Sequence, residues 1–163
     1  MKTFLLTLAL MGLVTGSLTL LHGWYSKRQE TTRAVASVRA SAQKGDRHAQ
    51  TRLATMFRLG RGVEQNYSKA ADWYRKAADQ KEALAQFFLG LMFRTGEGLP
   101  RDSTAAAEWF EKAADQGVAA AQYNLGRMYQ NGDGKPIDYA ASVKWYRHAA
   151  EQGLAIAQYK LGT

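Results

Sequence analysis

The sequence predicts an all-α fold, a right-handed helical solenoid of two-helix repeats with a period of 36 residues. The first observation is that Trp73, Trp109 and Trp145 lie 36 residues apart in closely similar segments. A fixed period of this length is typical of a repeat array. The second observation is that small and apolar residues recur at helical spacing within each period, separated by glycines and residues that favour helix ends.

Each period begins with a predicted first helix, which covers about residues 85–94 in the middle unit. Its recurring positions follow the spacing i, i+4, i+7 and i+8, which is one face of a helix. A Gly-x-Gly sequence comes next and is expected to end the helix, because glycine readily adopts the left-handed conformation of a C-cap. The predicted core of the first helices is formed by Leu53, Leu89, Leu125, Met56, Met92 and Met128.

A second helix is predicted in the other half of each period. Asn66, Asp102 and Asp138 recur in front of it and are good N-caps, since their side chains accept hydrogen bonds from free backbone amides. Large aromatic residues on this helix are expected to fill the space between neighbouring units. Replacing the middle tryptophan by alanine is expected to cost about 3–5 kcal/mol of stability. The predicted core of the second helices is Trp73, Trp109 and Trp145.

No group of residues in the sequence indicates a reaction or a metal site. There is no cysteine, and the histidines outside the N-terminal segment, His48 and His148, are far apart in the chain. The glutamines Gln50, Gln86, Gln122 and Gln158 recur with the period, which predicts a repeated hydrogen bond to the backbone. We therefore predict that the protein is not an enzyme, has no catalytic residues and needs no metal or cofactor.

Residues 1–26 are predicted to form a signal anchor or a signal peptide. Residues 3–26 carry no charge, and a helix needs about 20 apolar residues to cross a bilayer, which favours an uncleaved anchor. Residues 27–48 follow as a basic juxtamembrane segment and capping helix. Residues 49–163 form about three full repeats and a partial fourth. The net charge of +8 is largely juxtamembrane, so the repeats lack the basic stripe of a nucleic-acid-binding surface.

The predicted location is the bacterial inner membrane, with the repeats facing the periplasm and residues 3–26 in the membrane. If the leader is cleaved, the protein is periplasmic or secreted. The start of the chain, a lysine followed by Phe-Leu-Leu, is typical of exported bacterial proteins. The basic flank that follows the apolar segment favours a cytoplasmic position for the repeats by the positive-inside rule, so the orientation stays open at this point.

The recurring columns read A-x-A-Q-x-x-L-G-x-M-[YF]-x-x-G-x-G in the first helix and A-x-x-W-[YF]-x-[KH]-A-A-[DE]-Q-G in the second. In both, the chain resembles the Sel-1-like repeat family over about residues 41–162. The resemblance implies a helix–turn–helix solenoid related to tetratricopeptide repeats, and a scaffold that holds peptides or folded partners. The chain departs from the pattern at Ala54, where the family has glycine, and at Ser37, where an earlier unit would have tryptophan.

Residues that vary between units are predicted to bind the partner. They share a face of the first helices, at i, i+3, i+6 and i+7, and in related solenoids the first helices line a concave groove. An apolar centre at Phe88 and Leu91 suits an extended segment with acidic and apolar side chains. The alternative is that both residues pack under a neighbouring unit. The predicted basic rim consists of Arg52, Arg58, Arg94, Arg127 and Lys160.

The function predicted from these features is that of a non-catalytic protein–protein interaction scaffold or adaptor at the bacterial inner membrane. Its partner is another protein or peptide, and an envelope or cell-wall enzyme is one candidate. We expect no nucleic-acid partner and no small-molecule substrate. One alternative is a membrane-surface protein that acts through its basic segment on anionic lipid. A second, less favoured alternative is an envelope hydrolase or ligand-binding enzyme.

Overall fold

The computed structural model describes residue 26 and residues 29–162, and all regular secondary structure in this range is helical. Contacts divide the chain into two compact units, Met1–Ser37 and Val38–Thr163. The predicted leader of residues 1–26 lies outside the described residues, apart from Ser26. Within the part of the chain that is described, no helix is both long and apolar enough to cross a membrane.

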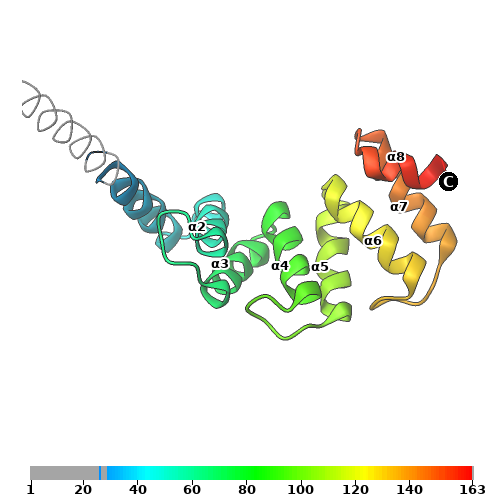
Figure 1. The fold of residues 1–163 in the computed structure, drawn as a ribbon, viewed down its shortest axis with the longest axis horizontal. Coiled ribbons are helices and arrows are strands. Elements are labelled where there is room, and N and C mark those ends of the chain that lie inside the picture. Colours follow the sequence, from blue (N-terminus) through cyan, green and yellow to red (C-terminus); the bar gives the residue numbers. More distant parts are fainter. Residues whose placement is uncertain (1–25, 27–28, 163) are drawn as a thin grey trace, which may run out of the picture. The chain divides into compact units, whose positions relative to one another are not determined.

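A helix over residues 29–43 precedes seven further helices, which follow one another in chain order (Figure 1). Corresponding helices begin 36 residues apart, and each packs mainly on its neighbours in the chain. This arrangement confirms the predicted all-α fold of consecutive helix pairs. The helices are α2 (Arg47–Leu59), α3 (Tyr67–Asp79), α4 (Ala83–Thr95), α5 (Ser103–Asp115), α6 (Ala119–Asn131), α7 (Tyr139–Glu151) and α8 (Ala155–Gly162).

The helix ends follow the predicted pattern. Asn66, Asp102 and Asp138 cap α3, α5 and α7, each accepting a hydrogen bond of 2.9 Å from the backbone amide three residues later. The first helices α2, α4 and α6 end at glycines with a left-handed backbone. Helix α4 begins two residues before the predicted start, because the buried Glu82 caps it: the Glu82 carboxylate accepts a hydrogen bond of 2.6 Å from the Ala85 amide.

The core contains the predicted leucines, which are fully buried, together with Met92 and Met128; Met56 is only partly buried. The three tryptophans are not fully buried, which corrects the sequence-based prediction. Each is half-buried and packs against the edge of a core cluster. The buried aromatic side chain is that of the next residue in each case: Tyr74, Phe110 and Tyr146, with exposed fractions of 0, 0 and 3%.

A chain of glutamines ties consecutive units together; the recurring glutamine column predicted its bonds to the backbone but not those between glutamines. The side-chain amide of Gln86 donates to the carbonyl oxygen of Ala78 at 3.2 Å, and its oxygen accepts a hydrogen bond of 2.6 Å from the Gln116 amide. Gln50 and Gln122 make the same pair of bonds one unit before and after. Gln86 therefore joins the second helix of one unit, α3, to the second helix of the next, α5.

Replacing Gln86 by leucine should lower the free energy of unfolding by about 1–3 kcal/mol, because the Ala78 carbonyl and the Gln116 amide each lose one hydrogen bond inside the protein. Each keeps another partner, the Lys81 amide for Ala78 and the Lys112 carbonyl for Gln116. Urea denaturation followed by circular dichroism measures the change. Gln158→Leu is a matched control, since Gln158 makes the same bond to the Ala150 carbonyl but is exposed. If Gln86→Leu and Gln158→Leu lower the free energy of unfolding equally, the buried position of the Gln86 bonds gives them no extra stabilising effect.

Candidate functional site

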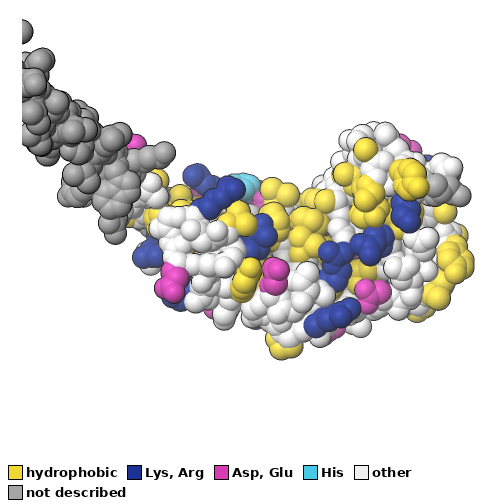
Figure 2. Space-filling model, viewed as in Figure 1, with side chains coloured by type: hydrophobic (Ala, Val, Ile, Leu, Met, Phe, Trp, Pro, Cys, Tyr) yellow, Lys and Arg dark blue, Asp and Glu magenta, His cyan; other side chains and the backbone are white. Residues whose placement is uncertain are grey.

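The predicted binding residues lie on the first helices α2, α4, α6 and α8. Arg52, Arg127 and Lys160 are exposed, whereas Arg58 and Arg94 are partly buried. Sites one period apart occupy matching places on consecutive first helices, so Arg52 corresponds to Phe88 and Arg58 to Arg94. On the face of the molecule in view in Figure 2, basic side chains stand among hydrophobic ones over the repeats.

Phe88 and Leu91 are partly buried and pack against core clusters, so they do not form a freely open apolar centre. The Phe88 ring stacks on Tyr74, with ring centroids 5.2 Å apart. Leu91 packs against the cluster built on α5 and α6. The structure therefore supports part of the alternative raised from the sequence: both side chains stabilise the array, and only their remaining exposed surface is available to a partner.

An arginine near the end of one first helix reaches across to the next first helix. The Arg58 guanidinium lies over the Phe88 ring, 5.0 Å from its centroid. Arg94 repeats this reach one unit later, and donates a hydrogen bond to the side-chain oxygen of Asn124. In both cases the residue reached lies 30 positions further along the chain. These lateral contacts were not predicted from the sequence, because residue spacing does not show where a long side chain turns.

The electrostatic environment of Arg94 disfavours its charged form. Burial lowers the pKa of Arg94, and the nearby positive charge of Arg127 lowers it further, while Asp133 and Tyr123 act in the opposite direction. Burial likewise raises the pKa of the Tyr74 phenol, and Thr55 and Arg58 oppose that shift. The Tyr74 hydroxyl and the Thr55 hydroxyl are 2.9 Å apart and share a hydrogen bond.

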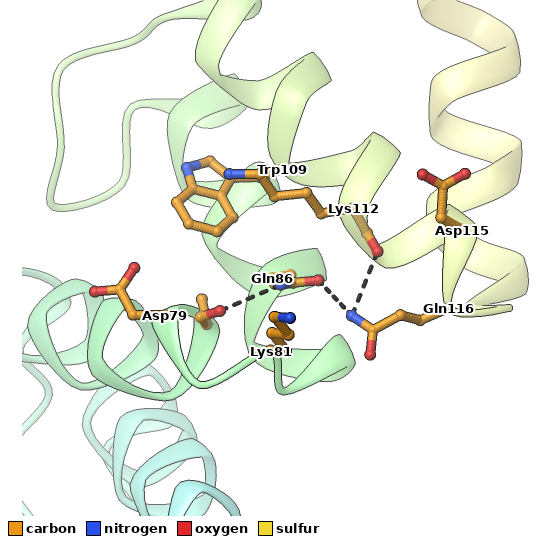
Figure 3. Close-up of a pocket in the computed structure, with 8 residues that line it drawn as sticks. Asp79, Lys81, Gln86, Trp109, Lys112, Asp115 and Gln116 are labelled. Carbon is orange, nitrogen blue, oxygen red and sulfur yellow. Dashed lines mark hydrogen bonds between the residues drawn. The ribbon is translucent and has the colours of Figure 1, made fainter.

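A separate groove of about 560 Å³ lies mainly on the second helices, between α3 and α5. Figure 3 shows Trp109 on one side of this groove and Lys81 on the other, with Gln86 between them and Gln116 beside Lys81. The Lys112 ammonium group covers the Trp109 ring at 3.9 Å from its centroid, a cation–π contact. We call this the Trp109 groove.

A second groove of about 310 Å³ lies one unit later, beside Trp145 and His148. Sequence reasoning missed both grooves, although a signal was present: a basic residue follows each recurring tryptophan at the third position. In the structure, Lys76 lies 4.4 Å from the centroid of the Trp73 ring in the same way. These lysine–tryptophan contacts recur with the period, and the lysines of the chain itself occupy the faces of the indole rings. We therefore interpret them as packing contacts and not as part of a ligand-binding site.

Among the residues that the structure describes, no cluster of three or more His, Asp or Glu side chains is placed to hold a metal ion. The two histidines of the repeats each lie beside a single carboxylate. His48 Nδ1 lies 3.6 Å from the Glu82 carboxylate, and His148 Nδ1 lies 3.8 Å from that of Glu151. Each histidine therefore has an acidic neighbour within its own or the adjoining helix pair.

Comparison with known proteins identifies the repeat. A family model described as the Sel1 repeat matches residues 47–82, 83–118 and 119–154. The chain belongs to the Sel1 repeat family. Each matched Sel1 repeat contains one helix pair, namely α2 with α3, α4 with α5, and α6 with α7. The protein is thus a Sel1-repeat helical scaffold, of a kind that typically binds proteins.

Solved structures of Sel1 repeat proteins from bacteria are similar. A Sel1 repeat protein from Oxalobacter formigenes is 38% identical, with a TM-score of 0.74, over 80% of this chain and 98% of that one. A protective antigen of uropathogenic Escherichia coli strains that displays an SLR fold is 40% identical, with a TM-score of 0.76, over 78% of this chain but only 27% of the antigen. Cysteine rich protein B of Helicobacter pylori, at 19% identity and a TM-score of 0.65 over 82% of this chain and 96% of that one, shares the fold. No curated protein matches significantly.

Proposed function

We propose that this Sel1 repeat protein is a non-catalytic adaptor that binds another protein on the face of its first helices. The observation that carries the proposal is a division of roles. The residues that recur with the period, such as Leu89 and Gln86, are buried and hold the units together. Among the residues that vary between units, Arg52 and Arg127 are exposed on the first helices, whereas Phe88 and Leu91 are partly buried. Solenoids commonly use such an extended face for binding.

The proposal includes a location and the absence of catalysis. Residues 1–26 would anchor the protein in the bacterial inner membrane or direct its export, so that the repeats face the periplasm. The absence of catalysis rests on the sequence, in which no acid, base and nucleophile converge. Protease added to intact spheroplasts tests the location. If residues 1–26 are an anchor, we expect the protease to digest the repeats. If they are cleaved on export, we expect the repeats to be found in the periplasmic fraction. Protection until the cells are lysed would place them in the cytoplasm.

Capture of the partner tests the binding face. The tagged protein is cross-linked in cells, purified and examined by mass spectrometry. The double variant Arg52→Glu, Arg127→Glu should capture at least about tenfold less of the partner than the wild type. The reversed charges at the interface would repel a ligand that is complementary to the arginines. Both side chains are exposed, so the free energy of unfolding should change by no more than about 0.5 kcal/mol.

The control for this experiment carries the same change of charge on second helices. Arg75 on α3 and Lys144 on α7 are both exposed. The double variant Arg75→Glu, Lys144→Glu should keep the partner at the wild-type level. If the two double variants lose the partner equally, binding depends on net charge alone, and the first-helix face is not the binding surface.

A further inference from the structure

Three arginines on the first-helix face lack an acidic partner within the described part of the chain. We call Arg58, Arg94 and Arg127 the arginine face. The ion pairs found among the described residues join Lys135 to Glu111, His48 to Glu82 and His148 to Glu151, and none of them includes the arginine face. Two of the three arginines are nevertheless partly buried. A buried charge is costly unless it is paired, so their position needs an explanation.

Arg58 shows the lack of a polar partner most directly. Its guanidinium lies over the Phe88 ring, 5.0 Å from the ring centroid. Its Nε atom is buried and, alone among the buried side-chain nitrogen and oxygen atoms of the described residues, has no hydrogen-bond partner. Leaving a buried donor without a partner carries a free-energy cost. Contact with an aromatic ring offsets only part of this cost, because the ring provides no directed acceptor.

Arg94, one unit later, has a hydrogen-bond acceptor but also lacks an acidic partner within ion-pair distance among the described residues. Its hydrogen-bond acceptor is the neutral amide of Asn124, and the positive charge of Arg127 is close enough to disfavour the charged form of Arg94. Arg94 and Arg127 both line a small hollow, with Asn124 and Asp133 also on its wall. Asp133 does not lie within ion-pair distance of either arginine. An anion bound between two positive charges would offset the repulsion between them.

We propose that the arginine face binds an extended, acidic segment of the partner protein, with one carboxylate held between Arg94 and Arg127 and a second on Arg58. This inference rests on the function proposed above and names the chemistry of the partner. A carboxylate matches the planar fork of guanidinium donors and accepts two hydrogen bonds at once. An apolar side chain between the two carboxylates contacts the exposed parts of Phe88 and Leu91, as in other extended peptides bound in a groove.

The structural alternative is that Arg58 and Arg94 serve only to tie neighbouring first helices together. Arg127 separates the two accounts, because it is exposed and makes no ion pair or hydrogen bond among those found in the described residues. Removing the Arg127 charge should leave the stability of the array unchanged under both accounts. Only the binding account expects it to weaken the affinity for an acidic ligand.

Fluorescence anisotropy with the full-length protein tests the inference. The probe is a fluorescein-labelled peptide made of three Glu-Leu-Ser-Glu units, and the same peptide with every glutamate replaced by glutamine is the neutral control. We expect saturable binding of the acidic peptide, and a loss of about tenfold in affinity for Arg127→Gln and for Arg94→Gln, because each removes a charged hydrogen-bonding partner. The variant Arg75→Gln, with the same loss of charge on a second helix, should bind within twofold of the wild type.

Three results would overturn the inference: no binding of the acidic peptide, equal losses for Arg75→Gln and Arg127→Gln, or tighter binding of a fluorescein-labelled twelve-nucleotide single-stranded DNA that depends on the same arginines. The thermal melt of each variant is recorded alongside. The peptide result is also compared with the capture experiment. If capture still depends on Arg52 and Arg127 while the acidic peptide does not bind, the acidic specificity is wrong and the proposed scaffold function stands. If both fail, the first-helix face is not a binding surface.

Discussion

Replacing Phe110 by alanine should lower the free energy of unfolding by about 3–5 kcal/mol, one of the largest effects expected in this chain. The Phe110 ring is fully buried and contacts the backbone of α4 at Gly90, where an added Cβ atom would lie 2.9 Å from the ring. The space left by the ring cannot close easily, since helices on both sides are fixed by the glutamine bonds. Urea denaturation followed by circular dichroism gives the value.

The neighbouring Trp109→Ala is the control for Phe110→Ala. Trp109 is half-buried at the edge of the core, and part of its surface faces a groove. The cost should therefore be about half as large, about 2 kcal/mol, since less apolar surface returns to water. A larger loss for Trp109→Ala than for Phe110→Ala would restore the tryptophans as the central core residues and contradict the burial described here.

Replacing Gly134 by alanine should destabilise the array by about 3 kcal/mol or more. Gly134 follows α6 and has a backbone φ of +75°, and an added Cβ atom would overlap the backbone of Ser103 at the start of α5. Two costs add: the left-handed conformation, about 1–2 kcal/mol for a residue with a side chain, and the displacement of a packed neighbour, about 1–3 kcal/mol. The same denaturation measurement applies.

Gly153→Ala separates these two costs. Gly153 has a similar backbone, with φ of +84°, but nothing lies within 4 Å of the added atom. Lys81 already occupies the corresponding position two repeats earlier with φ of 61°, so a side chain is tolerated there. Gly153→Ala should thus cost only about 1–2 kcal/mol. A cost for Gly134→Ala no larger than this would mean that the loop can move away from α5 freely.

The period in the sequence was enough to predict the helix pairs, their caps and the bonds from the glutamines to the backbone. Each of these features depends on local chemistry that repeats: Asp102 caps α5 just as Asn66 caps α3, and Gln86 meets the same backbone carbonyl as Gln122. The location of residues 1–26 and the identity of the partner remain predictions, since they lie outside the described residues or outside the chain.

The burial of the aromatic residues could not be predicted from the same pattern. Trp109 and Phe110 both recur with the period, and both are large and apolar. Which of the two is buried depends on the helix surface that each ring faces. Phe110 faces Gly90, whose lack of a side chain lets the ring approach the backbone of α4. The reach of Arg58 to Phe88 and of Arg94 to Asn124 was missed for a similar reason, because it depends on side-chain direction across two helices.

The central claim is that the repeated residues build the array while the first-helix face binds a protein. Photo-cross-linking in living cells tests it most directly, with benzoylphenylalanine placed either at position 131 on α6, which lines the same hollow as Arg127, or at position 112 in the Trp109 groove. Both positions are exposed. The account predicts a protein adduct of one defined mass from position 131 and none from position 112. Adducts from position 112 alone, or from neither position, would contradict it.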